Sequence, residues 1–258
     1  MDIHAGHIEA ITDIPRAGFW RRWLATLIDA IIVTLPFQIL AAVLFTLTAG
    51  TVQMESGFYN ACAATKTIPQ TLDPSPPHDS NFARVCQTSF FGATTGATLT
   101  VGRITKEGAV TTTVTQTYML DKEGRPVNGT SIDGIVVLAF LAYLVVMVWR
   151  NGRTLGARVT KVRVVDRENP GTSGIPLRKA IIRYLTMATG AVPAFALLIY
   201  RRTAYGDSAD AVFTADFFHW FLYTAAFGAV WMIVLIAQIA WKTDPIYDRL
   251  AGTAVLRD

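Results

Sequence analysis

Two charged residues at the start of a long apolar segment are the strongest candidates for chemistry. Arg22 and Asp29 are seven residues apart, so on a helix they share one face, about 10 Å apart along its axis. A carboxylate inside an apolar span is costly unless it is paired or hydrated, and it is therefore a functional-site candidate. A proton- or cation-coupled carrier needs such a carboxylate, because it can trade a proton for a metal ion.

A structural interpretation of the same pair stays open. The Arg22 side chain could extend to lipid phosphate, and Asp29 could hydrogen-bond to a neighbouring helix, with Ala25 between them letting that helix come close. Residue type and spacing alone do not separate these two roles.

The apolar residues around this pair lie in four long blocks. Hydrophobic residues make up 52% of the chain and charged residues 16%, against roughly 25% charged in typical globular chains. A bilayer crossing needs about 20 apolar residues. We predict an all-α membrane protein with four transmembrane helices and a small, possibly β-containing extracytoplasmic insertion. The predicted helices cover residues 24–49, 132–149, 180–200 and 213–241.

Basic residues near the ends of these helices predict their orientation. Most of them gather in three segments, the N-terminal tail 1–23, the connector 150–179 and the C-terminal tail 242–258, and Arg201 and Arg202 between the third and fourth helices are the opposing pair. The positive-inside rule places all three in the cytoplasm. The insertion 50–131 and the outer loop 201–212 then lie outside.

The insertion has two halves of different character. The first contains Pro74, Pro76 and Pro77, which exclude a regular helix there. The second is rich in threonine and valine, and the turn candidates KEG and DKEG divide it into strand-length runs, which predicts a small β-meander. Cys62 and Cys86 could form a disulfide outside the cytoplasm; two unrelated thiols are the alternative. In the connector, KVRVVD followed by ENPG predicts a short hairpin.

Three motifs together resemble the RDD family of bacterial membrane proteins. They are AGFWRRWLATLIDAII, the connector NGRTLGARVTKVRVVD with PLRKAIIR, and the tail DPIYDRLAGTAVL. The family pattern falls on Arg22, Ala25, Asp29 and Asp248, and Tyr247 stands where the family usually has histidine. The resemblance covers roughly residues 16–49 and 132–256 and leaves out most of the insertion. It implies a multi-pass protein of the bacterial cytoplasmic (inner) membrane. Some members are described as cation/proton antiporters.

The predicted topology puts all these motifs on the cytoplasmic side. We therefore predict a polar cluster in which Arg22 and Arg183 neutralise Asp29 and Asp248. The outer halves of the helices offer only Asp133, Asp216 and His219, which is sparse for alternating access through one small subunit. A transporter of this kind would work as a homo-oligomer or in a larger membrane complex.

Other classes of function lack sequence support. The chain has no phosphate-binding glycine loop with lysine, no H-E-x-x-H, no G-x-S-x-G and no zinc-type cysteine spacing. We therefore expect no enzyme activity, no metal site, no cofactor and no nucleic-acid partner. The expected partners are the lipid bilayer, monovalent cations and protons. The alternative function is a non-transporting membrane scaffold that binds a partner through the insertion.

Overall fold

The computed structural model of the chain describes residues 16–69, 72–108, 110–205 and 215–257. These residues form two compact units. The first unit comprises the described parts of Met1–Val33, Leu138–Leu197 and Phe221–Asp258, and the second comprises Thr34–Val137 and the described parts of Leu198–Trp220. Most of the predicted outer loop 201–212 lies outside the described residues.

Within the part of the chain that the structure describes, four helices are long and apolar enough to cross a membrane, as predicted. They are α2 (Phe19–Leu47), α3 (Asp133–Asn151), the segment Leu177–Arg201 within α5 and α6, and α7 (Ala215–Ala240). Their exposed surfaces carry large apolar side chains such as Ile39 and Ile233, which suits contact with lipid because the bilayer core offers no hydrogen-bond partners. The predicted all-α fold with a possibly β-containing insertion is confirmed only in part, since the described residues also form three β-sheets and the chain is not purely all-α.

The third long helical segment changes its winding in the middle. Helix α5 (Leu177–Met187) is followed by a 3-10 turn at Ala188–Ala191 and then by α6 (Val192–Tyr205). Gly190 lies in the 3-10 turn against Trp231 of α7, and a Cβ atom added to it would lie 2.7 Å from the Trp231 ring. The glycine therefore permits close packing of this turn on α7.

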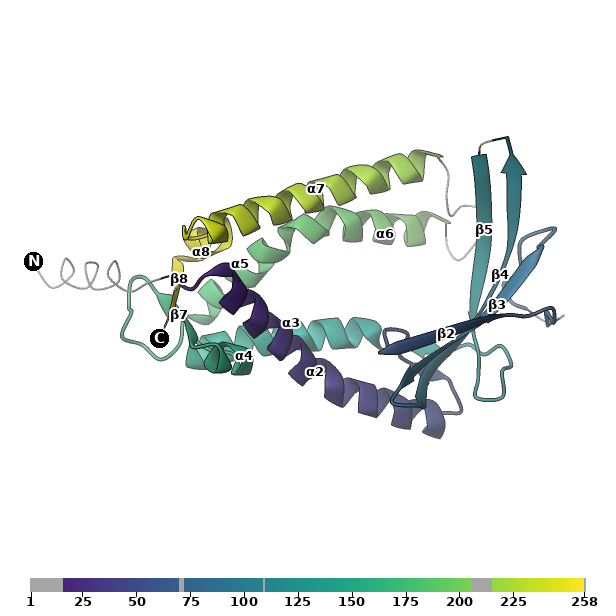
Figure 1. The fold of residues 1–258 in the computed structure, drawn as a ribbon, viewed down its shortest axis with the longest axis horizontal. Helices are drawn as coiled ribbons and strands as arrows, with labels where there is room; N and C mark the ends of the chain where they lie inside the picture. Colours follow the sequence, from purple (N-terminus) through teal and green to yellow (C-terminus); the bar gives the residue numbers. More distant parts are fainter. Residues whose placement is uncertain (1–15, 70–71, 109, 206–214, 258) are drawn as a thin grey trace, which may run out of the picture. The chain divides into compact units, whose positions relative to one another are not determined.

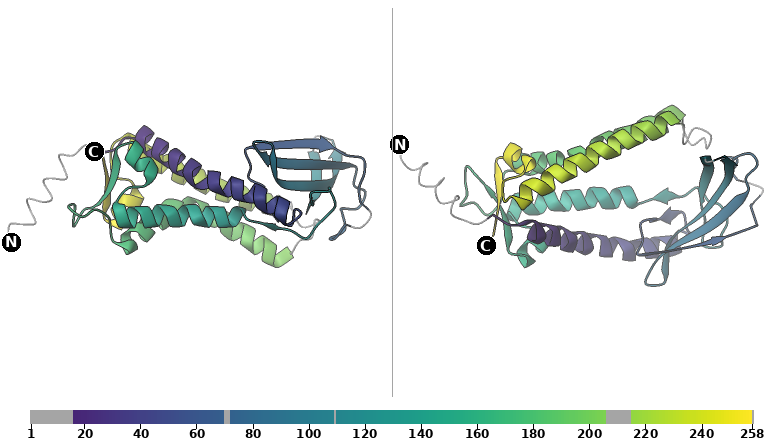
Figure 2. Two further views of the ribbon diagram at one scale, coloured as in Figure 1. Left: turned by 90° about the horizontal axis from the view of Figure 1, so that it is seen from below. Right: turned by 45° about the horizontal axis from the view of Figure 1, so that its top comes forward.

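The second unit contains a four-stranded antiparallel sheet of order β2-β3-β4-β5 (Figure 2). The strands are Tyr59–Ala64, Phe82–Phe90, Ala93–Glu107 and Val110–Met119. The predicted KEG turn joins β4 to β5. Strand β2 comes from the first half of the insertion, where the prolines had indicated only the absence of helix. Leu99, Val101 and Tyr118 lie in the core of the sheet.

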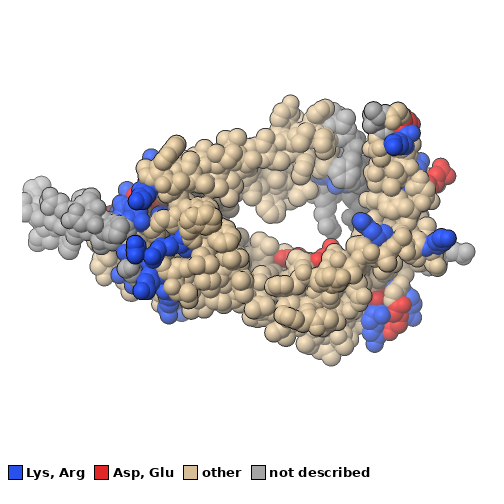
Figure 3. Space-filling model, in the orientation of Figure 1, with Lys and Arg blue, Asp and Glu red and all other residues tan. Residues whose placement is uncertain are grey.

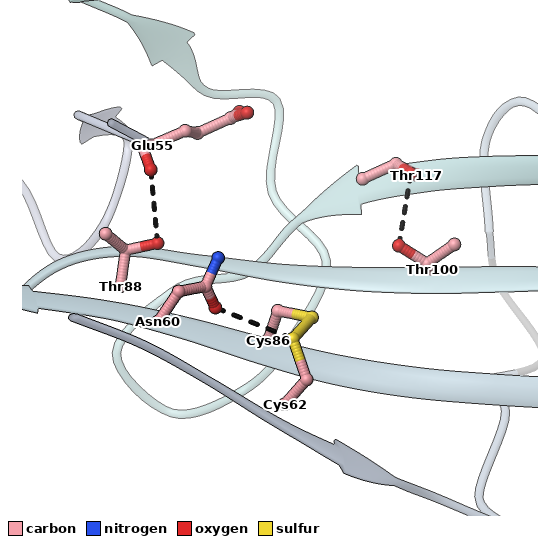
Figure 4. The surroundings of a disulfide bond; sticks show 7 residues. All are labelled: Glu55, Asn60, Cys62, Cys86, Thr88, Thr100 and Thr117. Carbon is pink, nitrogen blue, oxygen red and sulfur yellow. Dashed lines mark hydrogen bonds between the residues drawn. A yellow bond between two sulfur atoms is a disulfide. The ribbon is translucent and has the colours of Figure 1, made fainter. Parts of the chain in front are cut away.

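A disulfide ties the edge strand β2 to β3. Cys62 and Cys86 are direct cross-strand partners, and their sulfur atoms are bonded (Figure 4). The bond closes a loop that contains the prolines and has little secondary structure of its own. It thereby restricts the unfolded states of that loop.

The predicted DKEG turn is closed by its first residue. The Asp121 carboxylate accepts hydrogen bonds from the backbone N–H groups of Arg125 and Glu123, at 2.8 and 2.9 Å, and from the Arg125 side chain. The backbone bond from Arg125 is the main cause that lowers the pKa of Asp121 below its usual 3.8.

The two ends of the insertion lie side by side. Strand β1 (Val52–Gln53) pairs in parallel with β6 (Thr130–Ser131). The buried Gln53 side chain donates to the carbonyls of Gly50 and Leu120 and accepts from the backbone N–H of Ala97. The two short strands β1 and β6 therefore connect the sheet to α2 and α3.

The first unit contains a small sheet built from distant parts of the chain. Strand β7 (Val162–Asp166) pairs antiparallel with β8 (Thr253–Arg257), so the local hairpin predicted for the connector is wrong. The N-terminal segment joins the same sheet, since Arg16 bridges to Leu256 and the N–H of Ala17 donates to the carbonyl of Val255. The short helices α4 (Leu155–Val159) and α8 (Ile246–Ala251) lie close by (Figure 1).

Lysine and arginine side chains gather at this end of the first unit, around α4, α8, β7 and β8, whereas the visible surface of α7 is uncharged (Figure 3). The basic residues come from all three segments that meet there. In the three segments the lysines and arginines are Arg16, Arg21, Arg22, Arg150, Arg153, Arg158, Lys161, Arg163, Arg167, Arg178, Lys179, Lys242, Arg249 and Arg257. The three segments for which the sequence predicts a shared compartment are thus in direct contact.

Candidate functional site

A fully buried carboxylate at the start of α8 is paired with two arginines. Asp248 forms an ion pair with Arg22 of α2 at 3.2 Å through its Oδ2 atom, and a second with Arg183 of α5 through Oδ1. The hydroxyl of Thr253 donates to the same Oδ1 at 2.9 Å. Removal of this carboxylate would leave the buried Arg183 and the partly buried Arg22 without their counter-ion, which is strongly unfavourable.

Tyr247 completes this arginine–aspartate cluster. Its hydroxyl accepts a hydrogen bond from Arg22 at 3.4 Å, and its ring lies 5.0 Å from the Arg183 guanidinium. A guanidinium over an aromatic face is attracted by the ring electrons. The tyrosine at the position of the family's usual histidine thus contacts both arginines without supplying an imidazole.

The second buried carboxylate, Asp29 of α2, is held by neutral donors. Its Oδ1 accepts from the Tyr143 hydroxyl at 2.8 Å and from the N–H of Gly156 at 2.7 Å, and its Oδ2 accepts from the Thr154 hydroxyl. Thr154 is also the N-cap residue of α4. Asp29 therefore caps the first turn of α4, where N–H groups lack partners within the helix.

A close approach of two backbones makes this arrangement possible. A Cβ atom added to Gly156 would lie 2.1 Å from the carbonyl oxygen of Ala25. Ala25 itself is buried, so the two small residues let α4 lie directly against α2. This packing places the N–H of Gly156 within reach of Asp29, one helical turn after Ala25.

Both groups of residues border one cavity in the first unit. The cavity has a volume of about 280 Å³, and its polar lining includes Arg22, Asp29, Thr154, Arg183 and Tyr247. Apolar side chains form the rest of the wall, among them Leu144, Val148, Met232 and Ile236. A mostly apolar cavity with a few convergent polar groups is typical of a small-molecule site.

The structure brings together three of the four residues predicted to form the cluster. Arg22, Arg183 and Asp248 are in contact, whereas neither arginine forms an ion pair with Asp29. The donors to Asp29 were not identified from the sequence as its partners. For Thr154 and Gly156 a signal existed, because a threonine before a short helical run is a typical N-cap. Tyr143 offered none, being one aromatic residue in an apolar helix.

The other polar residues of the predicted helices lie elsewhere. Asp133 is in the second unit and accepts from the backbone N–H groups of Glu55 and Ser56, at 2.9 and 3.1 Å. His219 is in α7, and the side chain of Asp216 lies outside the described residues. Within the described part of the chain, no group of three or more His, Cys, Asp or Glu side chains is placed to hold a metal ion.

Four apolar helices of spanning length, with buried ion pairs linking them to the basic segments, define a multi-pass helical membrane protein. The chain belongs to the RDD family, whose model matches residues 90–252, more than half of its length. The match begins at the end of β3, within the insertion, and leaves α2 outside. No curated protein and no solved structure matches the chain.

Proposed function

We propose that this protein is a small-cation/proton exchanger of the bacterial cytoplasmic membrane and that Asp29 is its coupling carboxylate. The observation that carries the proposal is that Asp29 is buried, borders the cavity and, among the residues that the structure describes, accepts hydrogen bonds only from neutral donors. A carboxylate has about four acceptor positions, and the three donors to Asp29 leave one for a proton or a cation. Asp248 is less suited to exchange because two arginines neutralise it.

The proposed topology has the N-terminal segment, the connector and the C-terminal segment in the cytoplasm. It is supported by the pairing of β7 with β8 and of Arg16 with Leu256, which requires the three segments to share a side. The excess of lysine and arginine on that side favours the cytoplasm. The disulfide-bonded sheet would then lie in the oxidising compartment, where such bonds persist.

We further propose that the exchanger works as a homo-oligomer or within a larger membrane complex. The cavity is bordered by residues near the basic end of the helices. At the opposite end of α3, the Asp133 carboxylate already accepts hydrogen bonds from the backbone N–H groups of Glu55 and Ser56. Partner subunits would supply the polar groups that a pathway to the other side requires.

The test is cation-induced proton movement in vesicles that contain the purified protein. With a pH gradient imposed, addition of sodium, lithium or potassium should collapse the gradient in the wild type and not in Asp29→Asn. The matched control is Glu168→Gln, because Glu168 is an exposed carboxylate that pairs with Lys179 and should retain full exchange. Asp29→Asn must first be shown to be folded by its thermal midpoint. An inactive wild type across a range of pH, or an active, folded Asp29→Asn, would refute the proposal.

The second candidate function is a non-transporting scaffold that binds a partner through the sheet. It is favoured by the size of the disulfide-bonded sheet, which takes no part in the Asp29 site. Because β1 and β6 adjoin, residues 55–128 can be replaced by a short glycine-serine linker without separating α2 from α3. An exchanger should keep at least partial cation flux after this deletion, whereas a scaffold should lose the partner recovered by crosslinking.

A further inference from the structure

The second unit exposes a group of aromatic side chains at one end of its sheet. Phe91, in the turn between β3 and β4, is 90% exposed, and Phe58 and Tyr59 are each 66% exposed. The rings of Phe58, Phe90 and Phe91 contact each other edge to face, with centroids 5.7 and 4.7 Å apart. These four residues form one apolar surface, here called the aromatic tip. Its exposure to water would be unfavourable.

Contacts to α2 and α3 show where the aromatic tip lies along the axis of α2. The Gln38 side chain of α2 donates to the carbonyl of Ser56 at 2.6 Å, and Asp133 at the start of α3 binds the same residue. Helix α2 continues for nine residues beyond Gln38, which is about 13 Å along its axis. The chain therefore turns back beside α2 before it reaches Phe58.

The end of β3 lies at the same level. The hydroxyl of Thr88 donates to the carbonyl of Glu55 at 3.4 Å, and a Cβ atom added to Gly57 would lie 2.2 Å from the Thr88 methyl group. Strand β3 then runs on to Phe90 and the turn at Phe91. This end of the sheet thus lies beside α2 and not beyond its end (Figure 1).

The neighbouring surface of α2 is itself apolar. Ile39, Val43 and Leu47 are exposed on the part of the helix that extends past Gln38. If the bilayer covers these side chains, it also reaches the level of the aromatic tip. The sequence around the tip fits this environment, since it carries no charge between Glu55 and Lys66 or between Arg84 and Arg103.

We propose that the aromatic tip inserts into the bilayer surface on the side of the membrane that carries the sheet. Its partner is the lipid itself, at the boundary between headgroups and acyl chains, where aromatic rings are favoured. The opposite end of the β4–β5 hairpin, which carries Lys106 and Glu107, stays in water. Burial of the aromatic tip in the bilayer holds the sheet against the membrane independently of any transport activity.

Site-directed spin labelling of the full chain in vesicles of phosphatidylethanolamine and phosphatidylglycerol tests this placement. Both native cysteines are in the disulfide, so introduced cysteines can be labelled selectively without reductant. Labels at Phe58→Cys and Phe91→Cys should be accessible to oxygen and protected from a water-soluble nickel complex. The ratio of oxygen accessibility to nickel accessibility at these two positions should be several-fold higher than at Thr112→Cys, an exposed position on β5.

A label at Ile39→Cys separates the two ways in which the proposal can fail. If Ile39 shows lipid-like accessibility while Phe58 and Phe91 both show water-like accessibility, the proposal that the aromatic tip enters the bilayer is refuted, and the assignment of α2 as a membrane-spanning helix stands. Water-like accessibility at all three positions would refute both the insertion and the assignment of α2 as a membrane-spanning helix. Exchange activity enters neither outcome, so failure of the exchanger proposal remains a separate result.

Discussion

At the scale of single residues, the two aspartates predicted to share one cluster, Asp29 and Asp248, are both buried but differ in their partners. Asp248 is neutralised by Arg22 and Arg183, whereas Asp29 is held by two hydroxyls and one backbone N–H. The difference arises because Asp29 faces α4, and Asp248 faces α2 and α5. We therefore expect different consequences when each carboxylate is removed.

Asp248→Ala should lower the free energy of unfolding in detergent by about 3–5 kcal/mol, because it leaves the buried guanidinium of Arg183 and the partly buried one of Arg22 without their carboxylate. The matched control is Glu168→Ala, which removes an exposed partner of Lys179 and should cost at most about 1 kcal/mol. Chemical unfolding followed by tryptophan fluorescence measures both. Equal losses in the two variants would contradict the assigned role of Asp248.

The sequence supported the cluster only as far as charges can be matched. Charged residues on separate apolar segments are costly to bury unless opposite charges pair. This argument predicted the contact of Arg22 and Arg183 with Asp248. The same reasoning assigned an arginine to Asp29, and there it failed. Neutral donors carry no charge to balance, so nothing in the sequence distinguishes Tyr143 from other hydroxyl residues. The N-cap signal at Thr154 indicates the start of a helix but does not identify Asp29 as its partner.

At the scale of elements, apolar length was enough to locate the four long helices, because the hydrocarbon core demands it. Strand pairing was less accessible. Strand β7 was expected to pair with its neighbour in sequence, yet it pairs with β8 from beyond α7. Alternation of apolar residues indicates a strand but does not identify its partner, and the turn at Asn169–Pro170 favoured the wrong one.

The contact between α4 and α2 provides a test at this scale. Gly156→Ala should destabilise the protein by about 2–4 kcal/mol, since the added methyl meets the Ala25 backbone and displaces the N–H from Asp29. Gly134→Ala is the control, because no atom lies within 4 Å of the added Cβ. It should be neutral or slightly stabilising. Thermal midpoints in detergent compare the two, and a Gly156→Ala variant as stable as wild type would show that α4 can move away freely.

At the scale of the whole molecule, the chain consists of two units with different means of stabilisation. The first depends on buried ion pairs and on pairing between distant segments, and the second on a sheet core and a disulfide. Composition and periodicity revealed the helices and the β-rich character of the insertion. They did not reveal that β2 would arise from its proline-rich half, because β2 forms only against β3.

The double variant Cys62→Ser/Cys86→Ser should destabilise the sheet by about 3.5 kcal/mol, as expected for a loop closed by residues 24 apart. Hydrogen exchange followed by mass spectrometry should show faster exchange in β2 and β3. The peptides of α3 and α5 in the first unit should be unchanged. Faster exchange throughout the chain would show that the two units unfold together.

The pairing of β7 with β8 also has a consequence for biosynthesis. The connector leaves the ribosome before α5, α6 and α7 have been made, whereas β8 follows all of them. Until translation reaches α8 and β8, the edge of β7 lacks its partner strand, and the guanidinium groups of Arg22 and Arg183 lack the carboxylate of Asp248. Nascent chains arrested before that point would therefore present an open strand edge and unmatched cations, by which cellular quality control could distinguish them from finished molecules.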